Sequence, residues 1–257
     1  MTLGTIEVKS SREIEKMREA GRIVATVLKE IMALAQPGLT TSDLDAHAER
    51  RCADFGVIPA FKGYYGFPAC ICTSINHEVV HGIPSPRKKL KAGDVIKVDF
   101  GAIHEGWHGD SCVTIGLEPL TNDARRLIEI TEAALLKGIA RIKHGVPLQD
   151  ISGAIQDYVE ANNFSVVRQY VGHGVGRNLH EEPQVPNFRT REIPNPRLKA
   201  GMTLAIEPMV NVGHYATRVL ADRWTVVTID NSLSAQFEHT VLVTQDGYEI
   251  LTDRSKV

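Results

Sequence analysis

The sequence Leu90-Lys91-Ala92-Gly93-Asp94-Val95-Ile96-Lys97-Val98-Asp99 returns in related form as Leu198-Lys199-Ala200-Gly201-Met202-Thr203-Leu204-Ala205-Ile206-Glu207. Both copies begin with Leu-Lys-Ala-Gly, continue through an apolar run typical of a buried β-strand, and end on a carboxylate. A carboxylate on a buried strand is costly unless it is paired or binds a metal. Two such carboxylates at matching positions therefore predict one shared site.

The repeat extends beyond this block. Residues 38–44 (Gly-Leu-Thr-Thr-Ser-Asp-Leu) match residues 145–151 (Gly-Val-Pro-Leu-Gln-Asp-Ile) at an offset of 107 positions, and the Leu-Lys-Ala-Gly blocks lie 108 positions apart. A nearly constant offset across two separated matches predicts two halves with the same plan: a long helix, a turn, a short helix and strands.

Helix signals agree with this plan. Ser10 and Glu13 form a capping-box pattern before a long amphipathic stretch that Pro37-Gly38 ends. Thr40 and Asp43 then begin a shorter helix that ends near Gly56. In the second half, the long helix is expected from Asn122-Asp123 towards Gly145 and the shorter one from Asp150 to Asn162.

We therefore predict an α+β fold in which two helix pairs cover a mostly antiparallel sheet that both halves share. We expect a single catalytic domain, residues 1–257, with a short N-terminal segment 1–10 and pseudo-repeat halves of about 11–118 and 119–250. Two separate domains are the weaker alternative, because no Pro-, Ser- or Gly-rich linker lies near residues 117–122.

The composition of the 257-residue chain is that of a soluble globular protein, with 43% hydrophobic and 23% charged residues. The net charge of −2 does not favour nucleic acid as a partner. No apolar run approaches the roughly 20 residues that span a bilayer, and no signal peptide is evident. Such a chain is expected to be cytoplasmic, and its four cysteines are expected to be reduced, buried thiols: Cys52, Cys70, Cys72 and Cys112.

Two aspartates flank a predicted hairpin. Asp99 and Asp110 lie on either side of a turn at His104-Glu105-Gly106, which places them directly opposite each other with Cβ atoms roughly 4.5–5.5 Å apart. Opposed carboxylates repel each other, and a bridging divalent cation removes that conflict. The alternative is the exposed face of a polar hairpin, which the apolar residues around Asp99 disfavour.

The second half offers further metal ligands. Glu207 follows a strand, Glu238 lies within another, and His173 lies in a glycine-rich stretch with His180. A histidine alone in such a stretch is more often structural than a ligand. Taken together, however, four carboxylates balance two divalent ions, and oxygen ligands with one imidazole suit Mn, Fe, Co or Zn. Paired metals roughly 3.5–4 Å apart activate water in aminopeptidases.

These motifs resemble those of type I methionine aminopeptidases from about residue 10 to residue 250. The resemblance implies a pita-bread fold with two pseudo-symmetric halves. It also implies hydrolysis of the initiator methionine from nascent polypeptides with a small second residue, through a metal-bridging water. The motifs are His81-Gly82-Ile83-Pro84, the segment 99–110, the segment 172–183, Ile206-Glu207-Pro208-Met209 and Glu238-His239-Thr240.

The resemblance also implies roles for individual residues. It makes Asp99 a ligand of one metal, Asp110 and Glu238 bridging ligands of both, and His173 and Glu207 the remaining ligands. Glu207 is in addition implied as the proton shuttle, and His81 and His180 as catalytic residues that contact the substrate. The implied methionine pocket contains Tyr64, Phe67, Cys72, Leu179 and Trp224 beside these histidines; Phe61 and Leu179 depart from the usual residue types.

The expected partners are the N-termini of nascent polypeptides and the ribosome surface, with no membrane and a monomeric state. The basic stretches 87–91 and 189–199 are the candidates for ribosome contact, although a solvated charged face is the more usual explanation of each. We expect no N-terminal extension of the kinds that some relatives carry. Two alternative functions stay open: an Xaa-Pro aminopeptidase, whose family members usually carry an extra N-terminal domain, and a non-catalytic pita-bread module that binds RNA or protein.

Overall fold

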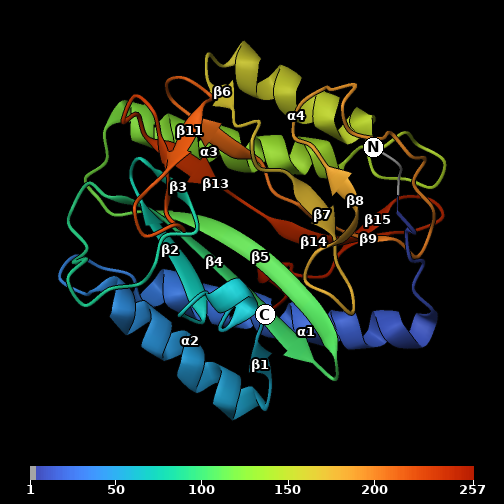
Figure 1. The fold of residues 1–257 in the computed structure, drawn as a ribbon, viewed down its shortest axis with the longest axis horizontal. Coiled ribbons are helices and arrows are strands. Elements are labelled where there is room, and N and C mark those ends of the chain that lie inside the picture. Colours follow the sequence, from blue (N-terminus) through green and yellow to red (C-terminus); the bar gives the residue numbers. More distant parts are fainter. Residues whose placement is uncertain (1–3) are drawn as a thin grey trace.

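Two pairs of α-helices enclose the strands in the computed structural model, which describes residues 4–257. In the view of Figure 1, the first pair lies below the strands and the second pair above them. The helices are α1 (Ser11–Leu34), α2 (Thr41–Phe55), α3 (Asn122–Ile139) and α4 (Gln149–Ala161), and two short 3₁₀ turns occupy Tyr64–Gly66 and Arg254–Lys256.

The helix ends follow the capping signals in the sequence. The backbone N–H and the hydroxyl of Ser10 both donate to the Glu13 carboxylate, which fixes the start of α1. Thr40 and Asp43 form the same arrangement at α2, and Gly56, with φ of 66°, ends that helix in the left-handed conformation. The expected extension of the third helix to Gly145 is wrong, because α3 ends at Ile139 and turns follow it.

Equivalent hydrogen bonds confirm that the two halves share one plan. The N–H of Gly38 donates to the carbonyl of Leu90 at 2.9 Å, and the N–H of Gly145 donates to that of Leu198 at 2.8 Å. Each Leu-Lys-Ala-Gly block therefore packs against the turn between its own helix pair. The repeated sequence encodes a repeated local structure, while the assignment of residues 1–257 to one domain stays a prediction.

All strand pairings among residues 4–257 are antiparallel, as expected, and they form four hydrogen-bonded ladders rather than one continuous ladder. The ladders are β1-β4-β2 with β5 beside β4, β13-β10-β6, β11-β12-β3, and β15-β14-β9-β7-β8. The strands are β1 (Ile58–Pro59), β2 (Ile71–Ile75), β3 (Glu78–Val80), β4 (Val95–His104), β5 (Trp107–Gly116), β6 (Ser165–Val166), β7 (Gly172–Gly174), β8 (Glu181–Val185), β9 (Thr203–Ile206), β10 (Met209–Asn211), β11 (Thr217–Val219), β12 (Val226–Thr228), β13 (Ser234–Gln236), β14 (His239–Val243) and β15 (Tyr248–Ile250).

The β4–β5 hairpin forms as predicted, but its register differs from the prediction. The turn consists of Glu105 and Gly106, both with positive φ, so Asp99 pairs with Cys112 and Asp110 pairs with Gly101. The two aspartates are thus diagonal neighbours on one face, not direct partners. Diagonal Cβ atoms lie up to about 7–8 Å apart, which leaves more room between the carboxylates than a direct pair would.

The halves meet where β5 runs along residues 234–240, a contact called the seam below. Two threonine hydroxyls bridge it. Thr114 Oγ1 donates to the carbonyl of Gln236 at 2.5 Å and accepts from its N–H at 3.0 Å. Thr240 Oγ1 does the same for Asp110, at 2.7 Å to the carbonyl and 3.0 Å from the N–H. Side chains thus complete the backbone hydrogen bonding where no ladder continues.

The main apolar core lies between the helices and the strands, and it draws on both halves, from Leu28 in α1 to Leu135 in α3. The four cysteines are buried and unpaired, as expected. Among residues 4–257, no helix combines the length and the apolar character needed to cross a bilayer.

Candidate metal centre and substrate pocket

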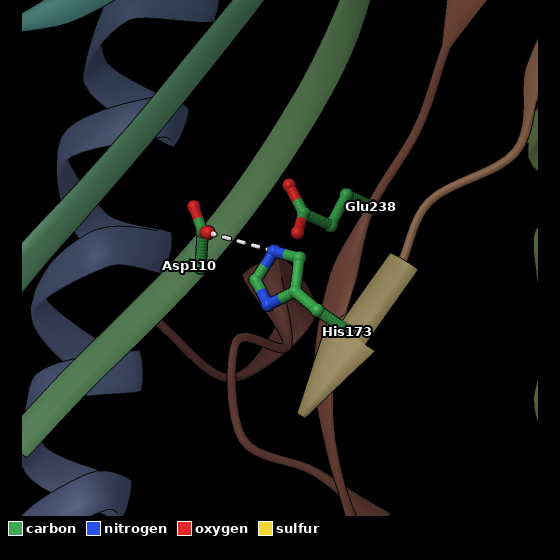
Figure 2. Close-up of side chains that lie close together, drawn as sticks. All are labelled: Asp110, His173 and Glu238. Atoms are coloured by element: carbon green, nitrogen blue, oxygen red, sulfur yellow. Dashed lines mark ion pairs between the residues drawn. The ribbon is translucent and has the colours of Figure 1, made fainter. Parts of the chain in front are cut away.

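Five predicted ligands converge near the seam from both halves of the chain. Asp99 lies in the middle of β4 and Asp110 in β5, while Glu238 lies between β13 and β14. His173 lies in β7, and Glu207 directly follows β9. Figure 2 shows the side chains of Asp110, His173 and Glu238 directed toward one another from three separate segments of the chain.

Distances divide these five residues into a compact group and two flanking carboxylates. Asp110, His173 and Glu238 each place one ligand atom within 4.8 Å of the others. His173 Nε2 is 3.8 Å from Asp110 Oδ2 and 3.5 Å from Glu207 Oε1. Asp99 is not in the compact group, although one of its carboxylate oxygens is buried in the same cavity wall.

The histidine is held in the orientation that a ligand needs. His173 Nδ1 lies 2.9 Å from the carbonyl of Gly174. Because only the N–H form of that nitrogen can donate to a carbonyl, Nε2 keeps its lone pair and faces the carboxylates. Burial, and secondarily the neighbouring His180, lowers the pKa of His173 to about 3, so the ring is neutral near pH 7.

The four carboxylates are in electrostatic conflict. Burial raises the pKa of Asp99, and burial together with the Asp99 charge raises that of Asp110. Burial and the two aspartates likewise raise the pKa of Glu207, and burial with Asp110 and Glu207 raises that of Glu238. Within residues 4–257, no lysine or arginine lies within 4.0 Å of these oxygens to relieve the repulsion.

Two observations fit this site to divalent cations. Asp99 Oδ1 and Asp110 Oδ1 are buried without a hydrogen-bond partner in the described part of the chain, which is rare for a native carboxylate. The set of four carboxylates and one neutral imidazole is also typical of Mn, Fe, Co or Zn ligation. The residues present therefore fit the group that the sequence predicts.

His180 lies beside the compact group and is oriented by Tyr64. The Tyr64 hydroxyl is 2.8 Å from His180 Nδ1, and the ring centroids of His180 and His173 are 4.2 Å apart. Burial lowers the pKa of His180, so the ring is neutral near pH 7. When the phenol donates to Nδ1, the ring hydrogen is on Nε2, which makes that atom a hydrogen-bond donor.

His81 stands at the aromatic side of the cavity. Its ring packs edge-to-face against Trp224 at 6.4 Å and Tyr170 at 5.7 Å. Its backbone has a φ of 59°, a strained value for a non-glycine residue that is common at functional sites. Burial, and secondarily His180, lowers its pKa to about 4.

An apolar cluster, separate from the main core, forms the rest of the cavity. Phe67 contacts Trp224 edge-on at 5.1 Å, and Cys72 and Leu179 are buried beside them. The cavity holds about 810 Å³ of empty space, including space open to solvent. All the site residues predicted from sequence line this one cavity: Tyr64, Phe67, Cys72, His81, Asp99, Asp110, His173, Leu179, His180, Glu207, Trp224 and Glu238.

Sequence reasoning missed several residues at the site. Tyr65 lines the cavity and is 86% exposed; its position between Gly63 and Gly66 was the available signal. Gln236 donates to Glu207 Oε2 at 3.3 Å, and the Asn187 amide donates to the Glu207 carbonyl at 3.2 Å. Thr240 was part of a recognised motif, but the sequence did not indicate that its hydroxyl holds the backbone of Asp110.

Comparison with protein families matches residues 15–245 to metallopeptidase family M24. The chain belongs to this family. Methionine aminopeptidase 1 of Bacillus subtilis is 52% identical over 95% of this chain and 98% of its own length. Methionine aminopeptidase of Escherichia coli K12 is 47% identical over 97% and 94% of the two chains. The resemblance to methionine aminopeptidases is thereby confirmed.

Solved structures agree on the fold. Methionine aminopeptidase of Thermotoga maritima superposes with a TM-score of 0.93 at 45% identity, covering 97% of this chain and all of that one. An Xaa-Pro dipeptidase from Bacillus anthracis gives a TM-score of 0.78 at 22% identity, covering 96% of this chain and 62% of that one. The second likeness shows the fold alone, and the predicted pita-bread fold is confirmed.

Proposed function

We propose that the protein is a metal-dependent hydrolase that removes the N-terminal methionine from polypeptides with a small second residue. The supporting observation is that a cluster of four carboxylates, two buried and two partly buried, and one imidazole opens into an apolar pocket. The close relatives are named methionine aminopeptidases, whereas the Xaa-Pro enzymes are distant relatives of the same fold. The presence of all five predicted ligand residues disfavours a non-catalytic binding module.

We infer that Asp99, Asp110, His173, Glu207 and Glu238 would hold two divalent ions. The four negative charges of the carboxylates balance the charge of two divalent ions. The unpartnered oxygens of Asp99 and Asp110 would then have a metal ion as their partner. When bound, such ions supply Lewis acidity and lower the pKa of water. Co, Mn, Fe and Zn all suit the donor set, and their relative affinities do not choose among them.

The chain's own groups supply binding, orientation and proton transfer. Glu207 is the proposed proton shuttle, since its carboxylate lies 3.5 Å from His173 and is steadied by Gln236. A carboxylate in this position can both take and release a proton. His180 Nε2 is placed to donate a hydrogen bond to the scissile carbonyl oxygen as negative charge develops there.

The pocket suits an unbranched apolar side chain. Phe67 and Trp224 form an aromatic wall, while the Cys72 sulfur and Leu179 complete the apolar lining. A thioether gains from contact with aromatic ring edges, which Phe67, Trp224 and Tyr64 offer. His81, at the edge of this wall, is placed to contact the substrate backbone. A methionine side chain fits these surfaces without burying an unpaired polar atom.

We further infer that the substrates are newly made chains and that the protein acts as a cytoplasmic monomer with the ribosome surface as a partner. In the basic stretches 87–91 and 189–199, several positive side chains are already bound to groups of this chain. Lys88 pairs with the buried carboxylate of Glu78 at 2.5 Å, and Arg189 pairs with Asp157. Arg197 donates to the carbonyl of Gly145. These side chains support loops of this chain.

Hydrolysis of defined peptides tests the proposal. The protein is loaded with Mn²⁺ and given Met-Ala-Ser, Met-Lys-Ser and Ala-Pro-Ser in parallel, with chelated protein as the control. We expect methionine release from Met-Ala-Ser that disappears on chelation and slow methionine release from Met-Lys-Ser. We expect no release of alanine from Ala-Pro-Ser. Cleavage of the proline peptide with Met-Ala-Ser left intact would overturn the assignment. An anomalous-scattering map then gives the number of ions.

A further inference from the structure

A buried ion pair lies outside the proposed site and links the N-terminal segment to it. Lys9 Nζ is 2.7 Å from Glu181 Oε2, and the two side chains are only 2% and 8% exposed. Lys9 precedes α1, whereas Glu181 is the first residue of β8 and follows His180 directly in the chain. A charge pair is a costly way to fill buried space, so its geometry calls for an explanation.

The lysine is held in place by its own backbone. The Lys9 N–H donates to the carbonyl of Gly201 at 2.9 Å. Gly201 has a φ of 93°, and a Cβ there would lie 2.7 Å from Val8 and 3.0 Å from the Lys9 carbonyl. The segment before α1 therefore packs directly on the turn before β9. The ammonium group of Lys9 is thus presented from a fixed backbone position.

The glutamate holds the segment that carries His180. Residues 175–180, called the His180 loop below, connect β7 to β8. Glu181 Oε1 accepts from the N–H of Asn178 at 3.0 Å, so the carboxylate binds Lys9 and the loop backbone at once. A Cβ on Gly176 would lie 2.6 Å from Lys9 and 2.7 Å from Glu181, so the loop rests directly on the pair.

The same loop supplies two walls of the cavity. Leu179 belongs to the apolar pocket, and His180 lies between Tyr64 and His173. The loop is also anchored at its N-terminal side, where the Gly176 carbonyl accepts from the His108 N–H at 2.9 Å and the Val175 N–H donates to the Thr203 carbonyl at 3.1 Å. These contacts hold the N-terminal side of the loop, and Glu181 holds its middle at Asn178. Among residues 4–257, Tyr64 alone hydrogen-bonds the His180 ring.

We propose that the buried Lys9–Glu181 pair is a positioning device that fixes the His180 loop, so that His180 and Leu179 face the substrate. Both residues are positioning residues, because they act through the loop and do not line the cavity. As far as His180 acts on the substrate, the inference rests on the proposed function. Charge-assisted hydrogen bonds fix direction as well as distance, which an apolar contact of equal volume does not.

A second ion pair joins the same two parts of the chain and serves as a matched control. Arg177, in the His180 loop, pairs with Glu13 of α1 at 3.2 Å. Its side chains are 60% and 30% exposed, so solvent screens the interaction. If any link between the N-terminal segment and the loop sufficed, loss of this pair would act like loss of the buried one.

The test compares three variants of the full chain loaded with Mn²⁺. Lys9→Met leaves the Glu181 carboxylate buried without its cation. The double variant Lys9→Met/Glu181→Leu replaces the whole pair by apolar side chains, a change that commonly preserves stability. Arg177→Met removes the exposed pair together with the stacking of the guanidinium on the Trp107 ring. For each variant we measure kcat and KM for Met-Ala-Ser, Mn²⁺ stoichiometry, urea unfolding, amide exchange of residues 175–180 and the imidazole ¹⁵N signals of His180.

In the double variant we expect stability and Mn²⁺ stoichiometry near those of the parent protein, but kcat lower by about 10- to 100-fold with KM little changed. Its loop amides should exchange faster, and its His180 signals should shift or broaden. Arg177→Met should match the parent protein in all readouts. Lys9→Met should show the same loop changes together with reduced stability.

Parent-like kcat, exchange and His180 signals in the double variant would overturn the proposal and leave the pair a merely structural contact. An equal loss in Arg177→Met would overturn it as well. Failure of the proposed function is distinguishable, because the parent protein itself would then not cleave Met-Ala-Ser. The exchange and ¹⁵N readouts would still decide whether the pair orders the loop.

Discussion

Replacing Thr240 by valine tests how the seam holds the candidate metal centre. The Thr240 hydroxyl donates to the carbonyl of Asp110 at 2.7 Å and accepts from its N–H at 3.0 Å. Valine has nearly the same shape but no hydroxyl, so it leaves both backbone groups of Asp110 buried without this partner. Thr240 is fully buried, so water does not replace the hydroxyl without a rearrangement.

The magnitude follows from the two groups left unpaired. An unsatisfied buried polar group costs about 1–3 kcal/mol, so Thr240→Val should lower the free energy of unfolding by about 2–6 kcal/mol. Thr131→Val is the matched control, because Thr131 is also fully buried but only donates to the carbonyl of Leu127 within α3. In Thr131→Val the Leu127 carbonyl keeps its hydrogen bond within the helix backbone. The free energy of unfolding should therefore change by less than about 1 kcal/mol.

Urea unfolding of the metal-free proteins, followed by circular dichroism, measures both changes, and calorimetric titration with Mn²⁺ measures the site. Thr240→Val should also bind Mn²⁺ more weakly, because Asp110 loses the contact that fixes its backbone. Equal stability losses in Thr240→Val and Thr131→Val, with Mn²⁺ binding unchanged, would refute the reasoning.

Three further predictions concern the site. His180→Ala should retain Mn²⁺ binding in calorimetry but lose most turnover of Met-Ala-Ser; loss of the metal would mean that ligand and substrate roles are exchanged. Mn²⁺ at about 100 times its dissociation constant should raise the free energy of unfolding by about 2.7 kcal/mol, reversed by chelation; an unchanged urea midpoint would argue against ligation. Because the folded pKa of His81 is about 4, the unfolded chain binds the extra proton between about pH 6.5 and pH 4, and stability falls on acidification through that window. Metal-free His81→Gln should therefore lose less stability than the parent protein over that range, and parallel curves would contradict the low pKa.

Much of the fold was predictable because related sequence blocks occur in both halves of the chain. The constant offset of the repeated blocks revealed the two halves, and capping residues such as Ser10 and Thr40 marked helix starts through local hydrogen bonds. The candidate ligands were predictable for a similar local reason. Asp99 interrupts an apolar strand and Glu207 directly follows one, where a carboxylate is too costly to be accidental.

What could not be predicted depends on contacts between distant segments. The hairpin register depends on the positive φ of both Glu105 and Gly106. A Glu-Gly pair indicates such a two-residue turn less strongly than Asn-Gly does. Thr114 and Thr240 look like ordinary strand residues until the halves are docked. Lys9 looks like any polar residue before a helix, because its partner lies 172 positions away.

The seam also has a kinetic consequence. Asp99 and Asp110 come from one half of the chain and His173, Glu207 and Glu238 from the other, so the proposed ligand set is complete only after the halves have docked. Ions that bind there stabilise the final assembly and not the separate halves. Contacts that form after the folding barrier slow unfolding and leave the folding rate nearly unchanged. Bound metal should therefore chiefly lower the rate at which the two halves separate during unfolding.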